Sequence, residues 1–222
     1  ARMKFLIKDI GKDEFLRLVE EEKKALSYQT VEIDTTTFDA PIPVPLVTAP
    51  KVTIEDVAAY EAWKKSNVIA QKQAGYVAIG IKVALGDFYT DKARALADLL
   101  KNYGANELRF TLRQDILIRN IKEENLPFFY QELAKLDFVT LGYNTINDVT
   151  ACPGTDTCNL GIASSTGIAV ELERVLATEY PQYSNNQEIT IKISGCMNAC
   201  GQHNMAEIGF QGMSINSGKL VA

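Results

Sequence analysis

The sequence predicts an α+β protein, and three observations support this prediction. Stretches with apolar residues at helical spacing alternate with stretches of two-residue alternation along most of the 222-residue chain. Residues 41–50 contain four of the seven prolines, a density that excludes a helix or a central strand. All four cysteines follow residue 151, so any thiol chemistry is confined to the C-terminal part of the chain.

The N-terminal stretch predicts two helices. An apolar face over 5–10 that ends at Gly11 indicates the first of them. Asp13 is placed to cap the second, which covers 14–26. A chain that begins within a helix and stops in a strand at 216–222 is expected to be a piece of a longer protein.

The middle of the chain predicts two helices and at least two strands. Thr53 caps a helix that runs over 53–68, and 76–83 alternates as a strand. A helix over 90–103 has apolar residues on one face. Residues 108–121 predict a strand or a broken strand pair. The apolar side of this stretch consists of the even positions Leu108, Phe110, Leu112, Ile116 and Ile118.

Helices and strands continue to alternate toward the C-terminus. A helix over 126–136 precedes a loop that holds the first two cysteines. A helix over 166–177 and a strand over 188–194 follow. The second cysteine pair comes next, and then a strand near 207–212.

Composition excludes several classes of protein. Hydrophobic residues at 46% and charged residues at 23% exclude a disordered chain and a coiled coil. The net charge of −5 argues against a nucleic-acid surface, which is normally basic. No apolar stretch approaches the length of about 18 residues that indicates a membrane span.

The cysteines form two close pairs. Cys152 and Cys158 have C-x5-C spacing, Cys196 and Cys200 have C-x3-C spacing, and residues 159–195 separate the pairs. A secreted disulfide scaffold is short and rich in cysteine, which this chain is not. Bound metal is therefore the favoured interpretation.

The spacing alone leaves an iron–sulfur cluster, a zinc site and disulfides or free thiols open. A [4Fe–4S] cube needs four thiolates, which two loops with two cysteines each can supply. Gly154, Gly161, Gly195 and Gly201 flank the pairs and allow backbone N–H groups to approach sulfur. Structural zinc prefers C-x2–4-C spacing, which only the second pair satisfies. The single histidine, His203, is expected to be a polar neighbour or a surface residue rather than a ligand.

Three arginines, Arg109, Arg113 and Arg119, fall on one face of 108–121. Charges on a strand usually form a solvated face. Three arginines on an otherwise apolar strand are less usual, and they indicate an anionic partner.

Two cysteine segments resemble the signature of the siroheme-dependent nitrite/sulfite reductase family. They read TACPGTDTC at 150–158 and SGCMNACGQ at 194–202. The stretches GYVAIGIKVALG at 75–86 and LRFTLRQDILI at 108–118 are similar to the family's ferredoxin-like half-domain, with its T-x-R-Q strand. The similarity extends from about residue 66 to the end, and the two N-terminal helices resemble the tail of a preceding lobe.

Within the α+β class, the resemblance implies a ferredoxin-like half-domain followed by an α/β nitrite/sulfite reductase 4Fe-4S lobe. Residues 1–50 then form the helical tail of a preceding lobe and a proline-rich linker, and 51–122 form the half-domain. Residues 123–222 form a truncated lobe that binds [4Fe–4S] and siroheme. Because members of the family are tandem duplications, the chain is expected to be the C-terminal half.

The resemblance also implies roles for individual residues. The implied ligands of the [4Fe–4S] cluster are Cys152, Cys158, Cys196 and Cys200, and Cys200 would supply the sulfur shared with the siroheme iron. The implied siroheme contacts are Thr111, Arg113, Gln114, Asn198, Cys200 and Gln202. Siroheme carries many carboxylates, which guanidinium and amide donors suit.

The implied activity is the six-electron reduction of sulfite to sulfide or of nitrite to ammonia, in a reducing, cytoplasmic compartment. The implied electron donor is ferredoxin or a flavoprotein. Gly80 stands where the family's first half-domain has an arginine that faces the substrate. The chain is therefore expected to need the N-terminal half of the same reductase and to be inactive alone. The alternatives are an iron–sulfur electron carrier without haem and a zinc-stapled interaction domain.

Overall fold

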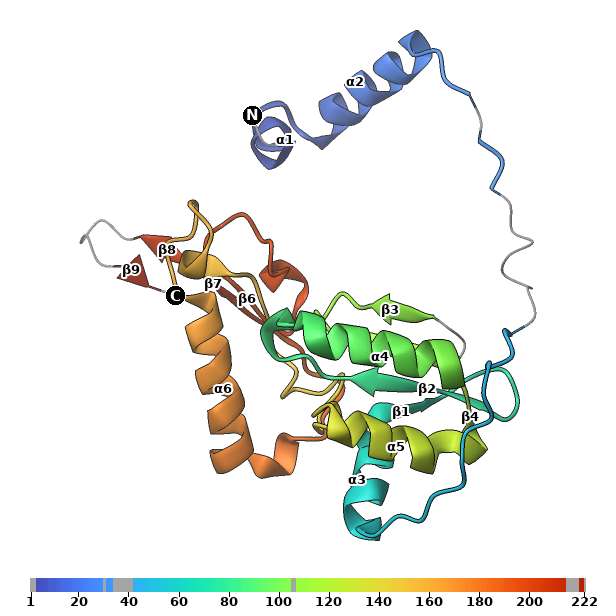
Figure 1. Cartoon of the computed structure of the whole chain (residues 1–222). Coiled ribbons are helices and arrows are strands. Elements are labelled where there is room, and N and C mark those ends of the chain that lie inside the picture. The colour runs from blue at the N-terminus through green and yellow to red at the C-terminus, as the bar shows by residue number, and fades with distance from the viewer. Residues whose placement is uncertain (1–2, 30, 34–41, 105–106, 215–219, 222) are drawn as a thin grey trace. The chain divides into compact units, whose positions relative to one another are not determined.

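The chain divides into two compact units, Ala1–Pro41 and Ile42–Ala222. The first unit contains α1 (Met3–Ile10) and α2 (Lys12–Ala25), which confirm the two predicted helices (Figure 1). The computed structural model describes residues 3–29, 31–33, 42–104, 107–214 and 220–221.

Gly11, and not Asp13, is the N-cap of α2. The φ angle of Gly11 is 83°, which glycine adopts without a steric penalty, and its carbonyl accepts the Phe15 N–H at 3.2 Å. Asp13 lies within the first turn, where its negative charge is close to the positive end of the helix dipole and stabilises the helix. The predicted cap is wrong because glycine's turn starts the helix two residues earlier.

An antiparallel sheet begins the second unit. Its strands run in the order β1-β2-β4-β3. They are β1 (Val68–Ala70), β2 (Tyr76–Ile81), β3 (Leu108–Phe110) and β4 (Ile116–Lys122). Three helices pack against this sheet, namely α3 (Val57–Asn67), α4 (Thr90–Tyr103) and α5 (Leu126–Lys135).

The structure shows one sequence expectation about this region to be wrong and decides between the alternatives of another. Asp56 caps α3 by accepting the Ala59 N–H at 2.9 Å, so Thr53 is not the cap. The stretch 108–121 is a strand pair, because the turn 111–115 reverses the chain between β3 and β4.

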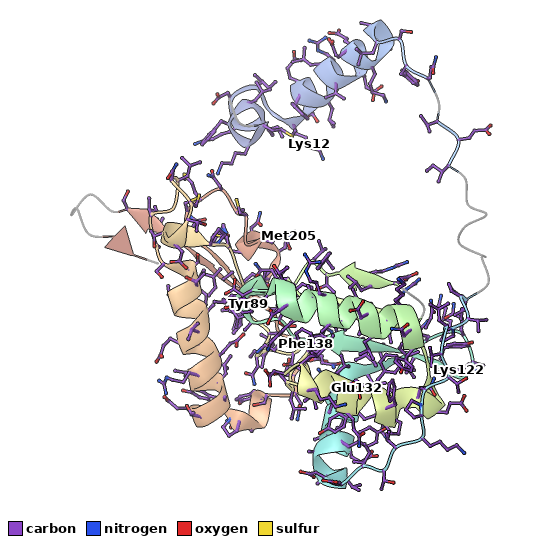
Figure 2. All side chains as sticks on the ribbon, in the orientation of Figure 1. Lys12, Tyr89, Lys122, Glu132, Phe138 and Met205 are labelled. Atoms are coloured by element: carbon purple, nitrogen blue, oxygen red, sulfur yellow. The ribbon has the colours of Figure 1, made fainter. Side chains whose placement is uncertain are left out.

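The core of the antiparallel sheet is apolar and aromatic. Its largest fully buried side chains include Trp63 of α3 and Phe129 of α5, and side chains fill the space between helices and sheet (Figure 2). The predicted apolar face of α4 is confirmed by its buried leucines, Leu96, Leu99 and Leu100. Burying side chains of this size contributes about 1.5–3 kcal/mol each.

A small parallel sheet forms the rest of the second unit, with strand order β5-β6-β7. Its strands are β5 (Thr150–Ala151), β6 (Ile191–Ser194) and β7 (Ile208–Gln211). Helix α6 (Ser165–Glu179) packs on this sheet around a second core, and Ser164 caps it through the Gly167 N–H at 3.3 Å. The strands β8 (Met213–Ser214) and β9 (Leu220–Val221) form an antiparallel pair.

Single turns of 3-10 helix join these elements. They are η2 (Ala84–Gly86), η3 (Glu123–Asn125), η4 (Gly154–Asp156), η5 (Pro181–Tyr183) and η6 (His203–Met205). Within the described residues, no helix has the length and apolar character needed to cross a membrane.

Candidate functional site

The turn 111–115 is held by Thr111. Its hydroxyl oxygen accepts the backbone N–H groups of Arg113 and Asp115, each at 3.2 Å. The Thr111 N–H donates to the Asp115 carbonyl at 2.9 Å. Gln114 is thereby held at a φ of 72°, a backbone conformation uncommon for residues other than glycine.

The Gln114 side chain reaches from this turn to the parallel sheet. Its amide nitrogen donates to the Ala151 carbonyl at 2.9 Å, and its amide oxygen accepts the Ala151 N–H at 3.0 Å. Both polar ends of the glutamine are therefore used at the residue that precedes Cys152. The antiparallel sheet and the first cysteine are directly connected.

Cys152 is fixed on three sides. Its N–H donates to the Ile193 carbonyl at 3.1 Å, and its carbonyl accepts the Ser165 hydroxyl at 2.6 Å. The Gly195 N–H donates to the Cys152 sulfur at 3.1 Å. Burial raises the pKa of the Cys152 thiol, but hydrogen bonding, above all from the Gly195 N–H, outweighs it and leaves that pKa below its ordinary value.

The two cysteine loops meet at Gly195. Its carbonyl accepts the N–H groups of Ile162 and Ala163 at 2.9 and 3.1 Å. A Cβ atom on Gly195 would lie 2.7 Å from the Gly154 Cα, so only glycine fits there. The expectation that a glycine lets a backbone N–H approach sulfur is confirmed at this position.

The four cysteines differ in exposure. Cys152 and Cys196 are half-buried, Cys158 and Cys200 are exposed, and all four are free thiols. Among the described residues, no three His, Cys, Asp or Glu side chains converge on one point as metal ligands. The two loops thus meet at Gly195, while no three of the four thiols form a ready-made ligand set among the described residues.

The donor set nevertheless fits an iron–sulfur cluster. Four thiols on two adjoining loops match the number and type of ligands that a [4Fe–4S] cube needs. A backbone N–H already points at one of those sulfurs, as it does where protein hydrogen bonds tune a cluster.

A group of polar side chains lies beside the second cysteine pair. The Gln202 amide oxygen accepts the Lys192 ammonium at 2.6 Å, and a guanidinium nitrogen of Arg113 lies 3.4 Å from the Thr145 carbonyl. Burial, and then the charge of Arg113, lower the pKa of Lys192. Asn198 is half-buried on the same loop as Cys196. These residues offer two cations and amide groups to an anion.

Arg109 and Arg119 do not join that group. Glu107 pairs with both of them, at 3.5 Å to Arg109 and 2.7 Å to Arg119. Arg113 lies on the turn 111–115 rather than on a strand. The expected row of three arginines on one strand face is therefore wrong, because that turn interrupts the strand.

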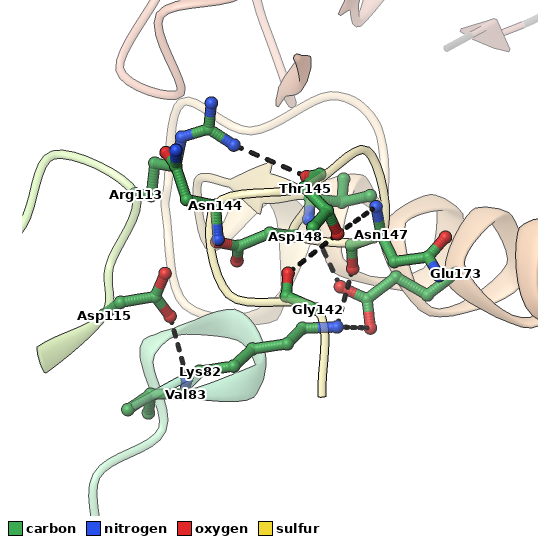
Figure 3. Close-up of polar contacts among 11 residues, drawn as sticks. Lys82, Val83, Arg113, Asp115, Gly142, Asn144, Thr145, Asn147, Asp148 and Glu173 are labelled. Carbon is green, nitrogen blue, oxygen red and sulfur yellow. Dashed lines mark hydrogen bonds and ion pairs between the residues drawn. The ribbon is translucent and has the colours of Figure 1, made fainter. Parts of the chain in front are cut away.

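Buried polar contacts join the antiparallel sheet to the segment 142–149 (Figure 3). The Lys82 ammonium donates to the Asn147 carbonyl at 2.6 Å and pairs with Glu173 at 3.0 Å. Asp115 accepts the Val83 N–H at 2.8 Å.

Asp115 lies against Asp148 within these contacts, and both are buried. Burial, followed by hydrogen bonding to Asp148 and its charge, raises the pKa of Asp115 to about 9. Asp148 itself accepts the Asn144 N–H at 2.8 Å. Two buried carboxyl groups in contact cannot both ionise cheaply, so Asp115 carries a proton at neutral pH.

Gly80 also lies at this junction. A Cβ atom on Gly80 would be 2.3–2.5 Å from three ring atoms of Tyr143. The Gly80 carbonyl accepts the Asn67 amide at 3.0 Å. The aromatic ring of Tyr143 fills the space in which another residue would carry its side chain.

Comparison with known proteins identifies this architecture. Residues 69–136 match the family model described as "Nitrite/Sulfite reductase ferredoxin-like half domain". The chain belongs to the nitrite/sulfite reductase family. That match covers the antiparallel sheet from β1 to β4 together with α4 and α5, and it confirms the expected fold class.

Several relatives from the nitrite/sulfite reductase family align with nearly all of this chain or with the larger part of it. "Sulfite reductase [ferredoxin] 1" of Mycolicibacterium paratuberculosis is 27% identical over 98% of this chain and 36% of its own length. "Ferredoxin--nitrite reductase, chloroplastic" of Betula pendula is 31% identical over 68% of this chain and 26% of its own length. The chain thus spans about a third, or less, of the length of these relatives.

Solved structures agree with the sequence comparisons. The structure of the Mycobacterium tuberculosis NirA protein has a TM-score of 0.59 and 29% identity, covering 100% of this chain and 37% of that one. A dissimilatory sulfite reductase I has a TM-score of 0.50 and 18% identity over 64% of this chain and 34% of that one, which supports the fold alone.

Sequence reasoning overlooked three features of this reductase-family site. Lys192 is a lysine within a buried strand, which was a visible signal. Nothing in the sequence indicated the other two, because their contacts join separate segments of the chain. Ser165 holds Cys152, and Tyr143 covers Gly80.

Proposed function

We propose that this chain is the cluster-bearing part of a siroheme- and [4Fe–4S]-dependent reductase that converts sulfite to sulfide or nitrite to ammonia. The observation that carries the proposal is the meeting of the two cysteine loops at Gly195, whose N–H donates to the Cys152 sulfur. The names of the relatives support the same activity class.

The four cysteines would hold the cluster, with Cys200 supplying the sulfur shared with siroheme. When bound, the cluster and siroheme supply single-electron transfer and the iron at which the oxyanion is reduced. The chain's own contribution is to fix Cys152, to donate hydrogen bonds to sulfur and to provide positive charge.

The siroheme carboxylates would be met by the polar group beside the second cysteine pair. Arg113 and Lys192 lie near each other, and among the described ion pairs neither has a carboxylate partner. Gln202 and Asn198 add amide groups on the adjoining loop, and Thr111 acts by shaping the turn that carries Arg113. A buried lysine near a half-buried arginine favours an anionic ligand.

The partners of this chain would be the remainder of the same reductase and a reduced electron donor. Names of relatives that include ferredoxin support ferredoxin as that donor. Gly80 offers no side chain, and Tyr143 fills its space, so β2 presents no cation to the substrate at that point. The substrate-binding cations would therefore come from the rest of the reductase.

Anaerobic reconstitution with iron and sulfide tests the cluster. We expect about four iron and four sulfide per chain, a broad brown absorption and, after reduction, a cluster EPR signal. Replacing Cys152, Cys158, Cys196 or Cys200 by serine should abolish or strongly reduce all three. Met197→Leu, on the same exposed loop, is the matched control and should behave as the wild type. Stoichiometric zinc without a cluster would contradict the proposal.

An activity assay tests the division of labour. With reduced methyl viologen as the donor, the chain reconstituted with cluster and siroheme should produce no more sulfide or ammonia than the cofactors alone. Sustained production of either by the chain alone would contradict the need for the rest of the reductase.

A further inference from the structure

The contact between Gln114 and Ala151 has two hydrogen bonds in opposite directions. The glutamine donates to the Ala151 carbonyl at 2.9 Å and accepts the Ala151 N–H at 3.0 Å. This pairing fixes the peptide units on both sides of Ala151. It needs a donor and an acceptor on one planar group, which a glutamine amide provides.

The surroundings of Gln114 leave it little freedom. A Cβ atom on Gly86 would lie 3.1 Å from the Gln114 Cβ, so the glutamine packs closely over that glycine. Its backbone is held at a φ of 72° by the turn that Thr111 stabilises. An uncommon backbone conformation persists where the surrounding contacts determine it, and such positions cluster at functional sites.

The residue next to Ala151 is the first cysteine. The Cys152 N–H donates to Ile193 and its carbonyl accepts from Ser165. Together with the two bonds at Ala151, the backbone of 151–152 is held by three separate elements. The direction of the Cys152 side chain is therefore set by the fold before any ligand binds.

We propose that Gln114 is a positioning residue for Cys152, acting through Ala151, and that the half-domain thereby orients the first cluster ligand. This inference rests on the proposed function and adds a role to it. It differs from the role implied by the sequence resemblance, in which Gln114 contacts siroheme directly. The two polar atoms of its side chain are already engaged by Ala151.

The test compares Gln114→Met and Gln114→Glu with Gln131→Met. Methionine keeps the length of the side chain and removes both hydrogen bonds, while glutamate keeps the acceptor alone. Gln131 is the matched control, because its amide also donates to a backbone carbonyl, that of Thr53 at 2.9 Å, but away from the cysteines.

The first measurement is amide hydrogen exchange at Ala151, which needs no cluster. Loss of the bond to the Ala151 N–H should speed its exchange about fivefold in Gln114→Met. Gln114→Glu should stay nearer the wild-type rate, and Gln131→Met should match it. Unchanged exchange in Gln114→Met would overturn the inference.

The second measurement is the state of the reconstituted cluster. In Gln114→Met, the cluster should be lost to a chelator about 10–100 times faster, with altered EPR g-values and reduction potential, because outer groups orient metal ligands. Gln114→Glu should be intermediate. Wild-type loss rate and g-values in Gln114→Met would overturn the inference, as would weaker siroheme binding with an unaltered cluster.

The two measurements separate this inference from the proposed function. If the wild-type chain assembles no cluster, the proposed function fails while the exchange measurement still decides whether Gln114 holds Ala151. If the methionine variant does not fold, as judged by circular dichroism, the glutamate variant decides. Partial loss of exchange protection in that variant supports the inference, and wild-type protection together with a wild-type cluster overturns it.

Discussion

Replacing Gly80 with alanine should destabilise the second unit by about 3 kcal/mol, at the upper end of overpacking penalties. The new methyl group would lie 2.3–2.5 Å from the ring of Tyr143, which is itself buried. The strand cannot easily move away, since Gly80 pairs with Leu117 across the sheet and its carbonyl accepts from Asn67. At 2–4 °C per kcal/mol, the midpoint of thermal unfolding should fall by roughly 6–12 °C.

A double-mutant cycle provides the control. Tyr143→Leu removes most of the ring, so Gly80→Ala should cost much less in that background than in the wild type. The free energies of unfolding of the four proteins, measured with urea, give the coupling directly. If the two substitutions are additive, the ring is not what excludes a side chain at position 80.

An arginine at position 80 would meet the same ring of Tyr143. Its side chain could be accommodated only if Tyr143 left the space over β2, which would expose the ring and uncover the junction with segment 142–149. Gly80 and Tyr143 therefore act as one unit. The packing of the Tyr143 ring against Gly80 occupies the space that an arginine side chain on this strand would need.

Local features of the fold were predictable from the sequence because they depend on near neighbours. The apolar face of α4 follows from the helical spacing of Leu96, Leu99 and Leu100, and all three are buried. The end of α1 at Gly11 is local in the same way. Caps were less predictable, because more than one residue near each helix start is of a type that caps helices. Gly11 competes with Asp13, and Asp56 competes with Thr53, until the turn geometry is known.

The candidate site was predictable in its ligand types and not in its supporting contacts. Paired cysteines and their glycines are sequence patterns. Gln114 gave no sign that it binds Ala151, since the two residues are 37 positions apart. Asp115 has the same odd-numbered alternation in 108–121 as the three arginines, yet it is fully buried because the turn 111–115 directs it toward Val83.

Asp115→Asn should make the protein more stable at pH 8, by about 1–3 kcal/mol, and should stabilise it less at pH 5 than at pH 8. Asparagine keeps an oxygen for the Val83 N–H, and its amide nitrogen replaces the other buried carboxyl oxygen, the one next to Asp148. That nitrogen can donate to Asp148. The substitution mimics the protonated acid and needs no proton.

The direction of the pH dependence follows from the pKa of Asp115. Folding raises it from an ordinary value of 3.8 to about 9, so between these pH values the folded chain holds a proton that the unfolded chain lacks. Stability contributed by this group is fully present below about pH 4 and is lost as the pH rises toward 9. Asp115→Asn should remove that decline.

The other charges around Asp115 do not cancel this effect. Lys82 lowers the Asp115 pKa, but its ammonium is already engaged by Glu173 and the Asn147 carbonyl. Tyr143 stays neutral over this range, since burial and then the charges of Asp115 and Asp148 raise its pKa to about 12. Asp148 is therefore the neighbouring group that opposes the ionisation of Asp115.

Urea unfolding of the wild type and Asp115→Asn from pH 5 to pH 9 measures the difference. The wild type should lose stability relative to the variant as the pH rises, so that the two curves diverge toward pH 9. Asp98→Asn, at an exposed position on α4, is the control and should run parallel to the wild type. Parallel curves for Asp115→Asn would mean that Asp115 and Asp148 do not share a proton, and that the junction tolerates both charges.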